Sequence, residues 1–176
     1  MAFSGLFSKS FGQKPHFTLQ SPDLGKWIKL EQVYDQYGCG GENISPQLYW
    51  HNAPKNTQSF AVTMFDPDAP TGKGWWHWLV FNIPNTVNEL PKNAGNPEMG
   101  LLPETVVQSI NDYGQYGYGG PCPPRGDKPH RYFVTVYALD VPFIDLGPDA
   151  KPELVEYYLK KHTISKAELI SLYGRD

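Results

Sequence analysis

Three long apolar runs dominate the hydrophobic pattern of the chain, and proline or glycine bounds them. They cover residues 59–65, 76–83 and 131–139. In each run apolar residues fall on both faces of an extended chain, which suits a buried strand better than a helix. The pattern therefore predicts three core strands of a sheet that is covered on both sides. Shorter candidates for strands lie at 16–20, 27–30 and 48–50, and a weaker one at 106–110.

The pattern changes near residue 150, where helical signals replace the apolar runs. Segment 152–161 begins with proline, which is tolerated in the first turn of a helix. One face of this helix would carry Leu154, Val155, Tyr158 and His162. Ser165 and Glu168 have the spacing of a capping box, so a second helix is expected there, ending at Gly174. We expect a mainly β fold with one or two short C-terminal helices.

Length and composition set the class of protein. The chain has 176 residues, enough for one domain with a sizeable core, which we assign to residues 15–176 after a loose arm at 1–14. Charged residues make up 19% and hydrophobic ones 40%, which is neither a disordered nor a membrane composition. The net charge of −3 disfavours a nucleic-acid binder. The N-terminus lacks the pattern of a signal peptide, so we expect a cytoplasmic protein with at most peripheral membrane contact.

Polar residues cluster where the long runs begin or end. Asp66 and Asp68 follow the first run and alternate with prolines, which stiffen the backbone around both carboxylates. His77 begins the second run among three tryptophans, an apolar setting typical of small-ligand sites. Each cluster alone also has a structural interpretation, because Asp-Pro pairs start ordinary turns and a lone histidine on an apolar face is usually structural.

The third cluster precedes the last run. Gly120 would let a ligand approach the backbone, and Pro121 belongs to a stiff, proline-rich loop. His130 and Tyr132 share parity at the start of the predicted strand, so both side chains face the same way. Arg131 faces the other side, which favours a structural role.

Together the three clusters predict one pocket for a small anion. Two histidines would donate hydrogen bonds to a phosphate or carboxylate. Asp66 or Asp68 would accept the second ring proton of a histidine and fix its tautomer. An aspartate could instead pair with an ammonium group on the ligand. Tyr132 and backbone N–H groups would supply further donors.

Cys39 and Cys122 lie in predicted loops near this pocket. We expect free thiols in a cytoplasmic protein, although a disulfide would be possible in an oxidising compartment. Cys122 with a histidine and an aspartate would make a nucleophilic set. No helix N-terminus is evident to lower its pKa, so we predict no catalytic residue and no enzyme, with a hydrolase as the less favoured alternative. His77 and His130 have donors that metals use, but no paired spacing supports a metal or another cofactor.

The clusters resemble the signature of a known family. The stretches Asp66-Pro-Asp-Ala-Pro70, Gly74-Trp-Trp-His-Trp78, Gly119-Gly-Pro-Cys-Pro-Pro124 and His130-Arg-Tyr132 resemble those of the phosphatidylethanolamine-binding proteins, also called Raf-kinase-inhibitor-like proteins. Stretch 41–50 is similar to the family's Asn-x-Ser-Pro-x-Leu-x-Trp segment. The resemblance covers at least residues 38–140. The bacterial and archaeal branch is the closer likeness, because of the spacing before His77 and the stretch 111–114.

This resemblance implies a fold, a site and partners. The fold would be a central antiparallel β-fold with a second small sheet and C-terminal helices. The anion site would be built on Asp66, His77, His130 and Tyr132, with Asp68, Gly120 and Pro121 lining or shaping it. The ligand would be a phosphate group, a phospholipid headgroup such as phosphoethanolamine, or a related anion. Since some eukaryotic relatives inhibit kinases, the alternative is a regulator that binds a kinase or another signalling protein and in which the pocket is secondary.

Overall fold

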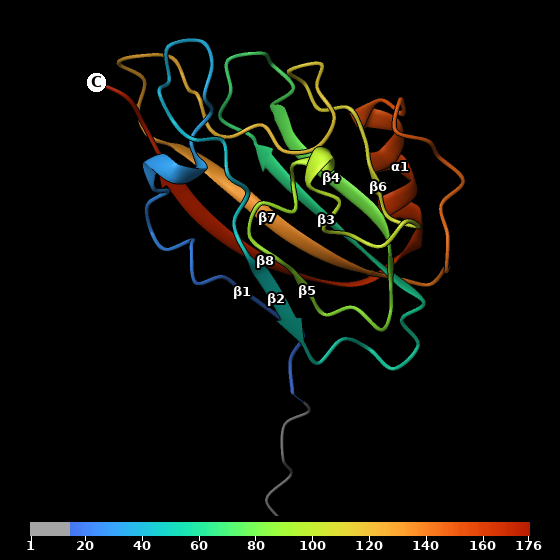
Figure 1. Cartoon of the computed structure of the whole chain (residues 1–176). Helices are drawn as coiled ribbons and strands as arrows, with labels where there is room; N and C mark the ends of the chain where they lie inside the picture. Colours follow the sequence, from blue (N-terminus) through green and yellow to red (C-terminus); the bar gives the residue numbers. More distant parts are fainter. Residues whose placement is uncertain (1–14) are drawn as a thin grey trace, which may run out of the picture.

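Two antiparallel sheets form the part of the chain that the computed structural model describes, residues 15–176 (Figure 1). The larger sheet has the strand order β6–β4–β3–β7–β8, made by Val107–Gln108, Trp75–Pro84, Ser59–Asp66, His130–Leu139 and Thr163–Tyr173. The smaller sheet has the order β1–β2–β5, made by Thr18–Gln20, Leu48–His51 and Glu89–Leu90. One helix, α1 (Pro152–His162), and two 3-10 turns, Leu30–Gln32 and Pro97–Met99, are the helical elements of the described residues. The predicted mainly β fold with a second small sheet is confirmed. The predicted arm at 1–14 lies outside the described residues.

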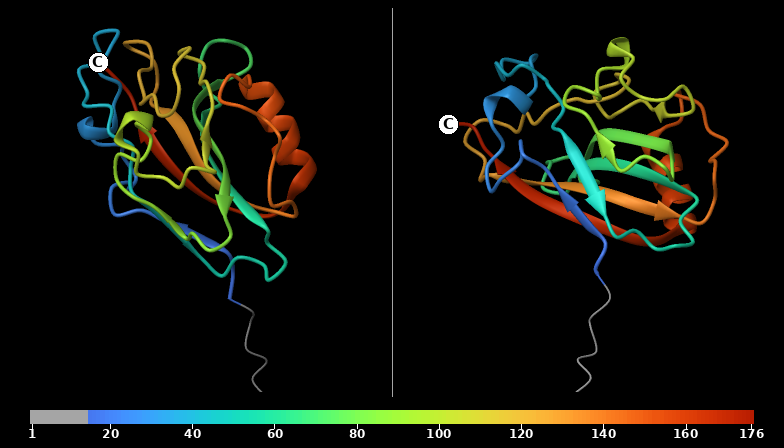
Figure 2. Two further views of the ribbon diagram at one scale, coloured as in Figure 1. Left: turned by 45° about the vertical axis from the view of Figure 1, so that its right-hand side comes forward. Right: turned by 60° about the horizontal axis from the view of Figure 1, so that its bottom comes forward.

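The three long apolar runs are confirmed as β3, β4 and β7, the central strands of the larger sheet. Side chains on one face of this sheet pack with the small sheet, as Trp78 does with Trp50 of β2 in one apolar cluster. Side chains on the other face pack against α1, as Leu79 does with Val155 in a second cluster. Figure 2 shows α1 and β2 on opposite sides of the large sheet. Cover on both faces explains why these strands are apolar throughout instead of alternating.

Most of the shorter elements are confirmed with small shifts. Segments 16–20 and 106–110 contain β1 and β6, and segment 48–50 lies within β2. The strand predicted at 27–30 is wrong, because Trp27 forms only a single bridge to Leu172 before the chain enters a 3-10 turn.

The helix predicted over residues 152–161 is confirmed as α1, but its buried face differs from the expected one. Leu154 is 44% exposed, whereas Pro152, Val155 and Leu159 are buried. Three cations in its last turn, Lys160, Lys161 and His162 when protonated, suit the negative end of the helix dipole. No helix within residues 15–176 has both the length and the apolar content needed to cross a bilayer.

The second helix, predicted from the capping-box spacing of Ser165 and Glu168, is wrong. These residues lie in β8, which pairs antiparallel with β7 from His130 opposite Tyr173 to Leu139 opposite Thr163. Between residues 166 and 171, exposed positions alternate with more buried ones, which is the period of a strand. The long ladder of main-chain hydrogen bonds to β7 therefore outweighs a local helix-start signal.

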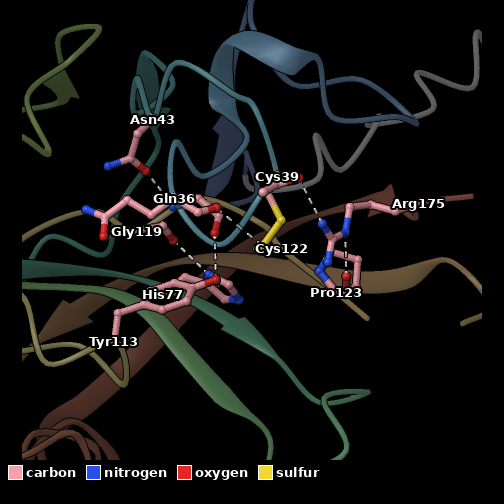
Figure 3. The surroundings of a disulfide bond; sticks show 11 residues. Gln36, Cys39, Asn43, His77, Tyr113, Gly119, Cys122, Pro123 and Arg175 are labelled. Atoms are coloured by element: carbon pink, nitrogen blue, oxygen red, sulfur yellow. Dashed lines mark hydrogen bonds between the residues drawn. A yellow bond between two sulfur atoms is a disulfide. The ribbon is translucent and has the colours of Figure 1, made fainter. Parts of the chain in front are cut away.

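A disulfide joins Cys39 to Cys122, with Cα atoms 5.7 Å apart, so the expectation of free thiols is wrong (Figure 3). The two loops are also joined by Arg175, whose Nε donates to Pro123 O at 2.7 Å and whose Nη1 donates to Gly38 O at 3.3 Å. Disulfides are typical of oxidising compartments, so this bond gives no support to the cytoplasmic location expected from the sequence, which stays a prediction.

Candidate functional site

A cavity of about 260 Å³ lies at one end of the large sheet, where the end of β3 meets the starts of β4 and β7. Antiparallel pairing brings these strand ends together, as the register of Asp66 opposite Trp75 shows. The lining consists of Tyr37, Asp66, Ala69, Pro70, Thr71, Trp75, His77, Tyr113, Cys122, Pro123, Pro124, His130 and Tyr132. The volume is below the range of about 300–1,000 Å³ of drug-sized sites, so it suits a molecule the size of a headgroup.

Asp66 and His130 form a buried pair in this pocket. His130 Nδ1–H donates to Asp66 Oδ2 at 2.8 Å, and Asp66 Oδ1 accepts from the backbone N–H of Asp68 at 2.8 Å. His130 Nε2 lies 3.4 Å from Asp127 Oδ2, which is long for a strong hydrogen bond. The structure thus pairs an aspartate with a histidine as the sequence led us to expect, in a geometry that lets the carboxylate accept the ring proton.

His77 is held by the glycine-rich loop (Figure 3). Its Nδ1–H donates to Gly119 O at 2.7 Å, and Gly119 N–H donates back to His77 O at 2.8 Å. Burial lowers the pKa of His77 to about 4, so the ring is neutral at neutral pH. A neutral ring whose Nδ1 carries the proton has an unprotonated Nε2. In this tautomer the second nitrogen of His77 is an acceptor, whereas the sequence led us to expect a donor, and the role of His77 toward a ligand stays a prediction.

Two donors in the pocket have no partner among residues 15–176. They are the hydroxyl of Tyr132 and the indole Nε1–H of Trp75, and both atoms are buried. Burial also raises the pKa of Tyr132 far above its usual range, which keeps the hydroxyl protonated. A buried polar group without a partner costs about 1–3 kcal/mol, so a ligand that supplies acceptors here would remove that cost.

Aromatic residues from loops close the pocket, and the sequence analysis did not identify them. Tyr113 donates through its hydroxyl to Gly120 O at 3.0 Å and stacks on Tyr34 with ring centres 4.1 Å apart. Asn111 Oδ1 accepts from Tyr113 N–H, a turn that aims this ring inward. Tyr37 lies at the rim with a left-handed φ of 53°. The turn-forming Asn111 was the available signal for Tyr113, and we find none for Tyr37.

Of the seven predicted site residues, the structure brings Asp66, His77, His130 and Tyr132 together and leaves the other three outside the lining. Asp68 is bound by Arg131, whose Nε and Nη2 donate to its two oxygens at 2.9 and 2.8 Å. The backbone of residues 32–34 approaches Gly120 closely. Pro121 O accepts from Tyr34 N–H at 3.1 Å.

These three residues therefore shape the pocket from outside its lining. Of the three prolines in the loop, Pro123 and Pro124 face the cavity and Pro121 does not. The sequence alone does not decide which of these prolines faces the pocket.

Substitution of Asp68 by Asn is expected to lower the melting temperature slightly at neutral pH, because the pair with Arg131 is solvent-exposed. Arg131 holds the pKa of Asp68 at about 2, below its ordinary value of 3.8. The stabilisation is therefore present above pH 3.8 and lost as the pH falls through about 2. Thermal melts of wild type and Asp68→Asn should diverge at pH 7 and converge near pH 2. If the difference in melting temperature stays constant over this range, the pair of Asp68 with Arg131 is not what stabilises the wild type.

Cys122 lines the pocket with its sulfur in the disulfide. The alternative of a nucleophilic Cys–His–Asp set needs a thiolate at this position, and the bonded sulfur contradicts it. Within residues 15–176, no group of three His, Cys, Asp or Glu side chains is arranged to hold a metal ion.

Larger hollows lie elsewhere on the described part of the chain, with volumes of about 360, 470, 520 and 1050 Å³. Their described lining residues include none of the five side chains that have a buried polar atom without a partner. The smaller cavity combines buried titratable groups with unpaired donors, so it is the candidate site.

Comparisons with known proteins agree with the resemblance seen in the sequence. The family model described as phosphatidylethanolamine-binding protein matches residues 20–174. UPF0098 protein YbcL of Escherichia coli is 47% identical over 149 residues, which is 85% of this chain and 81% of that protein. A UPF0098 protein of Methanothermobacter thermautotrophicus is 46% identical over 144 residues, 82% of this chain and 91% of that protein. The crystal structure of YbcL, described as a new member of the mammalian PEBP family, matches with a TM-score of 0.89 and 44% identity over 91% of this chain and 99% of that chain.

Proposed function

The chain belongs to the phosphatidylethanolamine-binding protein family, and from this premise we propose that its 260 Å³ pocket binds a small phosphate-like anion without catalysing a reaction. The observation that carries the proposal is the pair of buried, unpaired donors, Tyr132 Oη–H and Trp75 Nε1–H. Both line the same small cavity and both require an acceptor. Phosphate and carboxylate oxygens are acceptors of the right size.

The charges around the pocket also limit how it binds. No lysine or arginine is among its lining residues in the described part of the chain. The one carboxylate, Asp66, already accepts from His130 and from a backbone N–H, so it is not an open repulsive group. Binding would therefore depend on directed hydrogen bonds in an apolar, partly closed site more than on net positive charge.

Substitution of Tyr132 by Phe is expected to weaken binding of phosphoethanolamine about tenfold, because one charge-assisted hydrogen bond is lost. The same change should raise the free energy of unfolding by about 1 kcal/mol, because it removes a buried hydroxyl that has no partner. Calorimetric titration and denaturant unfolding measure the two effects. Tyr49→Phe, on β2 outside the lining, is the matched control. Unchanged affinity in Tyr132→Phe would show that this hydroxyl does not bind the ligand.

A stronger test compares two pairs of histidines. His77→Ala/His130→Ala removes both pocket rings and should abolish saturable binding of phosphate and phosphoethanolamine. His16→Ala/His51→Ala changes two exposed histidines outside the pocket and should bind like wild type. If wild type binds neither anion at millimolar concentration, the proposal fails, and the alternative of a regulator that acts through a protein partner is the one to pursue.

A further inference from the structure

The unprotonated nitrogen of His77 is a feature that a plain anion site does not need. Gly119 O can only accept a hydrogen bond, so the Nδ1 that lies 2.7 Å from it carries the proton. The one hydrogen bond of the His77 side chain among residues 15–176 is made by Nδ1, and Nε2 is not among the fully buried atoms without a partner, so Nε2 is open to the cavity that His77 lines. The pocket therefore offers a ligand one acceptor beside the two donors of Tyr132 and Trp75.

The groups around His77 do not supply a proton for this nitrogen. From β3, Asp66 favours the charged ring, but it is already bonded to His130 of β7, whose own charge would oppose a second one. The rings of Tyr113 and Tyr132 stand edge-on to His77, with centres 5.6 and 5.2 Å away. Burial is the largest influence on the pKa of His77 and lowers it.

A fully ionised oxyanion has only acceptors, so one of its oxygens against Nε2 would leave two lone pairs facing each other. A phosphate monoester avoids this conflict, because its second pKa is near 6 and one oxygen still carries a proton in part of the population at pH 7. We infer that the pocket selects phosphate monoesters in their singly protonated form, with the ligand O–H donating to His77 Nε2. The inference rests on the proposed function and narrows it.

The proton remains on the ligand oxygen, and no covalent bond forms or breaks. Phosphodiesters, which include phospholipid headgroups, have no second ionisable proton, and sulfate esters are fully ionised at neutral pH. Either ligand could form a hydrogen bond with Nε2 only if His77 itself took up a proton, and burial disfavours the charged ring. The same headgroup could reach the pocket as a free monoester or as part of a lipid. The pocket would favour the free monoester and disfavour the lipid-linked diester.

Three ligands that share the ethanolamine group test this inference on the unmodified protein. They are phosphoethanolamine, glycerophosphoethanolamine and ethanolamine sulfate, titrated by calorimetry at pH 6, 7 and 8. Phosphoethanolamine should bind at least about tenfold more tightly than either of the others at pH 7, since an unmatched acceptor costs at least that factor. Its affinity should fall by up to about tenfold per pH unit above pH 6. Titrations in buffers of different ionisation enthalpy should show net proton uptake that rises toward one at pH 8.

The outcomes separate this inference from the proposed function. Equal affinity for the sulfate ester or the phosphodiester, or binding of phosphoethanolamine without proton uptake at pH 8, would overturn the selection of protonated monoesters while leaving an anion site in place. Failure of all three ligands to bind would instead reject the anion pocket itself.

Discussion

Reduction of the Cys39–Cys122 disulfide is expected to lower the free energy of unfolding by about 3 kcal/mol. The bond links residues 83 positions apart, so it restricts the unfolded chain strongly. In the folded protein it joins a loop whose Tyr37 lines the pocket to one whose Cys122 and Pro123 do so. Reduction should therefore also weaken ligand binding, because two walls of the cavity lose their covalent link.

Urea unfolding with and without a dithiol reductant measures the effect, with a thiol count to verify complete reduction. Cys39→Ser/Cys122→Ser is the matched control, and its unfolding midpoint should match that of the reduced wild type and be insensitive to the reductant. If fully reduced wild type unfolds at the same urea concentration as the oxidised protein, the disulfide does not stabilise the fold.

Substitution of Gly120 by Ala is expected to destabilise the protein by about 3 kcal/mol, at the upper end of the usual cost of overpacking. A Cβ atom at this position would press into the backbone of residues 32–34, which cannot rotate away as a side chain could. The same residue donates through its N–H to Asn43 Oδ1 at 2.7 Å and accepts from Tyr113 Oη–H at 3.0 Å. A displaced Gly120 would therefore move Tyr113 and the support of His77 together.

Thermal or urea unfolding measures this loss, and Gly147→Ala is its matched control, because open space surrounds a Cβ atom there. Gly147→Ala should change stability little. Wild-type stability in Gly120→Ala would show that the loop can shift without cost, and the assignment of Gly120 as a packing residue would be wrong.

The sequence predicted the parts of the molecule that depend on local pattern. Strands buried on both faces have long apolar runs, so β3, β4 and β7 were identified within about two residues. Parity placed His130 and Tyr132 on one side of a strand and Arg131 on the other, as found. Because these strands pair antiparallel, four of the seven predicted site residues meet in one cavity.

The errors arose where distant segments decide the outcome. The capping-box signal at Ser165 concerns a single turn of chain, whereas β8 gains a ladder along the whole of β7. The disulfide depends on two loops that meet only in the folded protein. The tautomer of His77 depends on a carbonyl 42 residues away in sequence, so residue type alone could not indicate it.

The position of β8 and Arg175 in the chain has a consequence for biosynthesis. Translation proceeds from the N-terminus, so β7, which carries His130 and Tyr132, leaves the ribosome before its outer neighbour β8. Until residues 163–173 emerge, the nascent chain exposes the unpaired edge of a ten-residue strand, a template for wrong pairing and a target for chaperones. Arg175, which connects Gly38 to Pro123, arrives later still. The pocket is therefore completed only after residue 175 has been made, and a translation product that stops before residue 163 lacks the strand and the clamp that hold it.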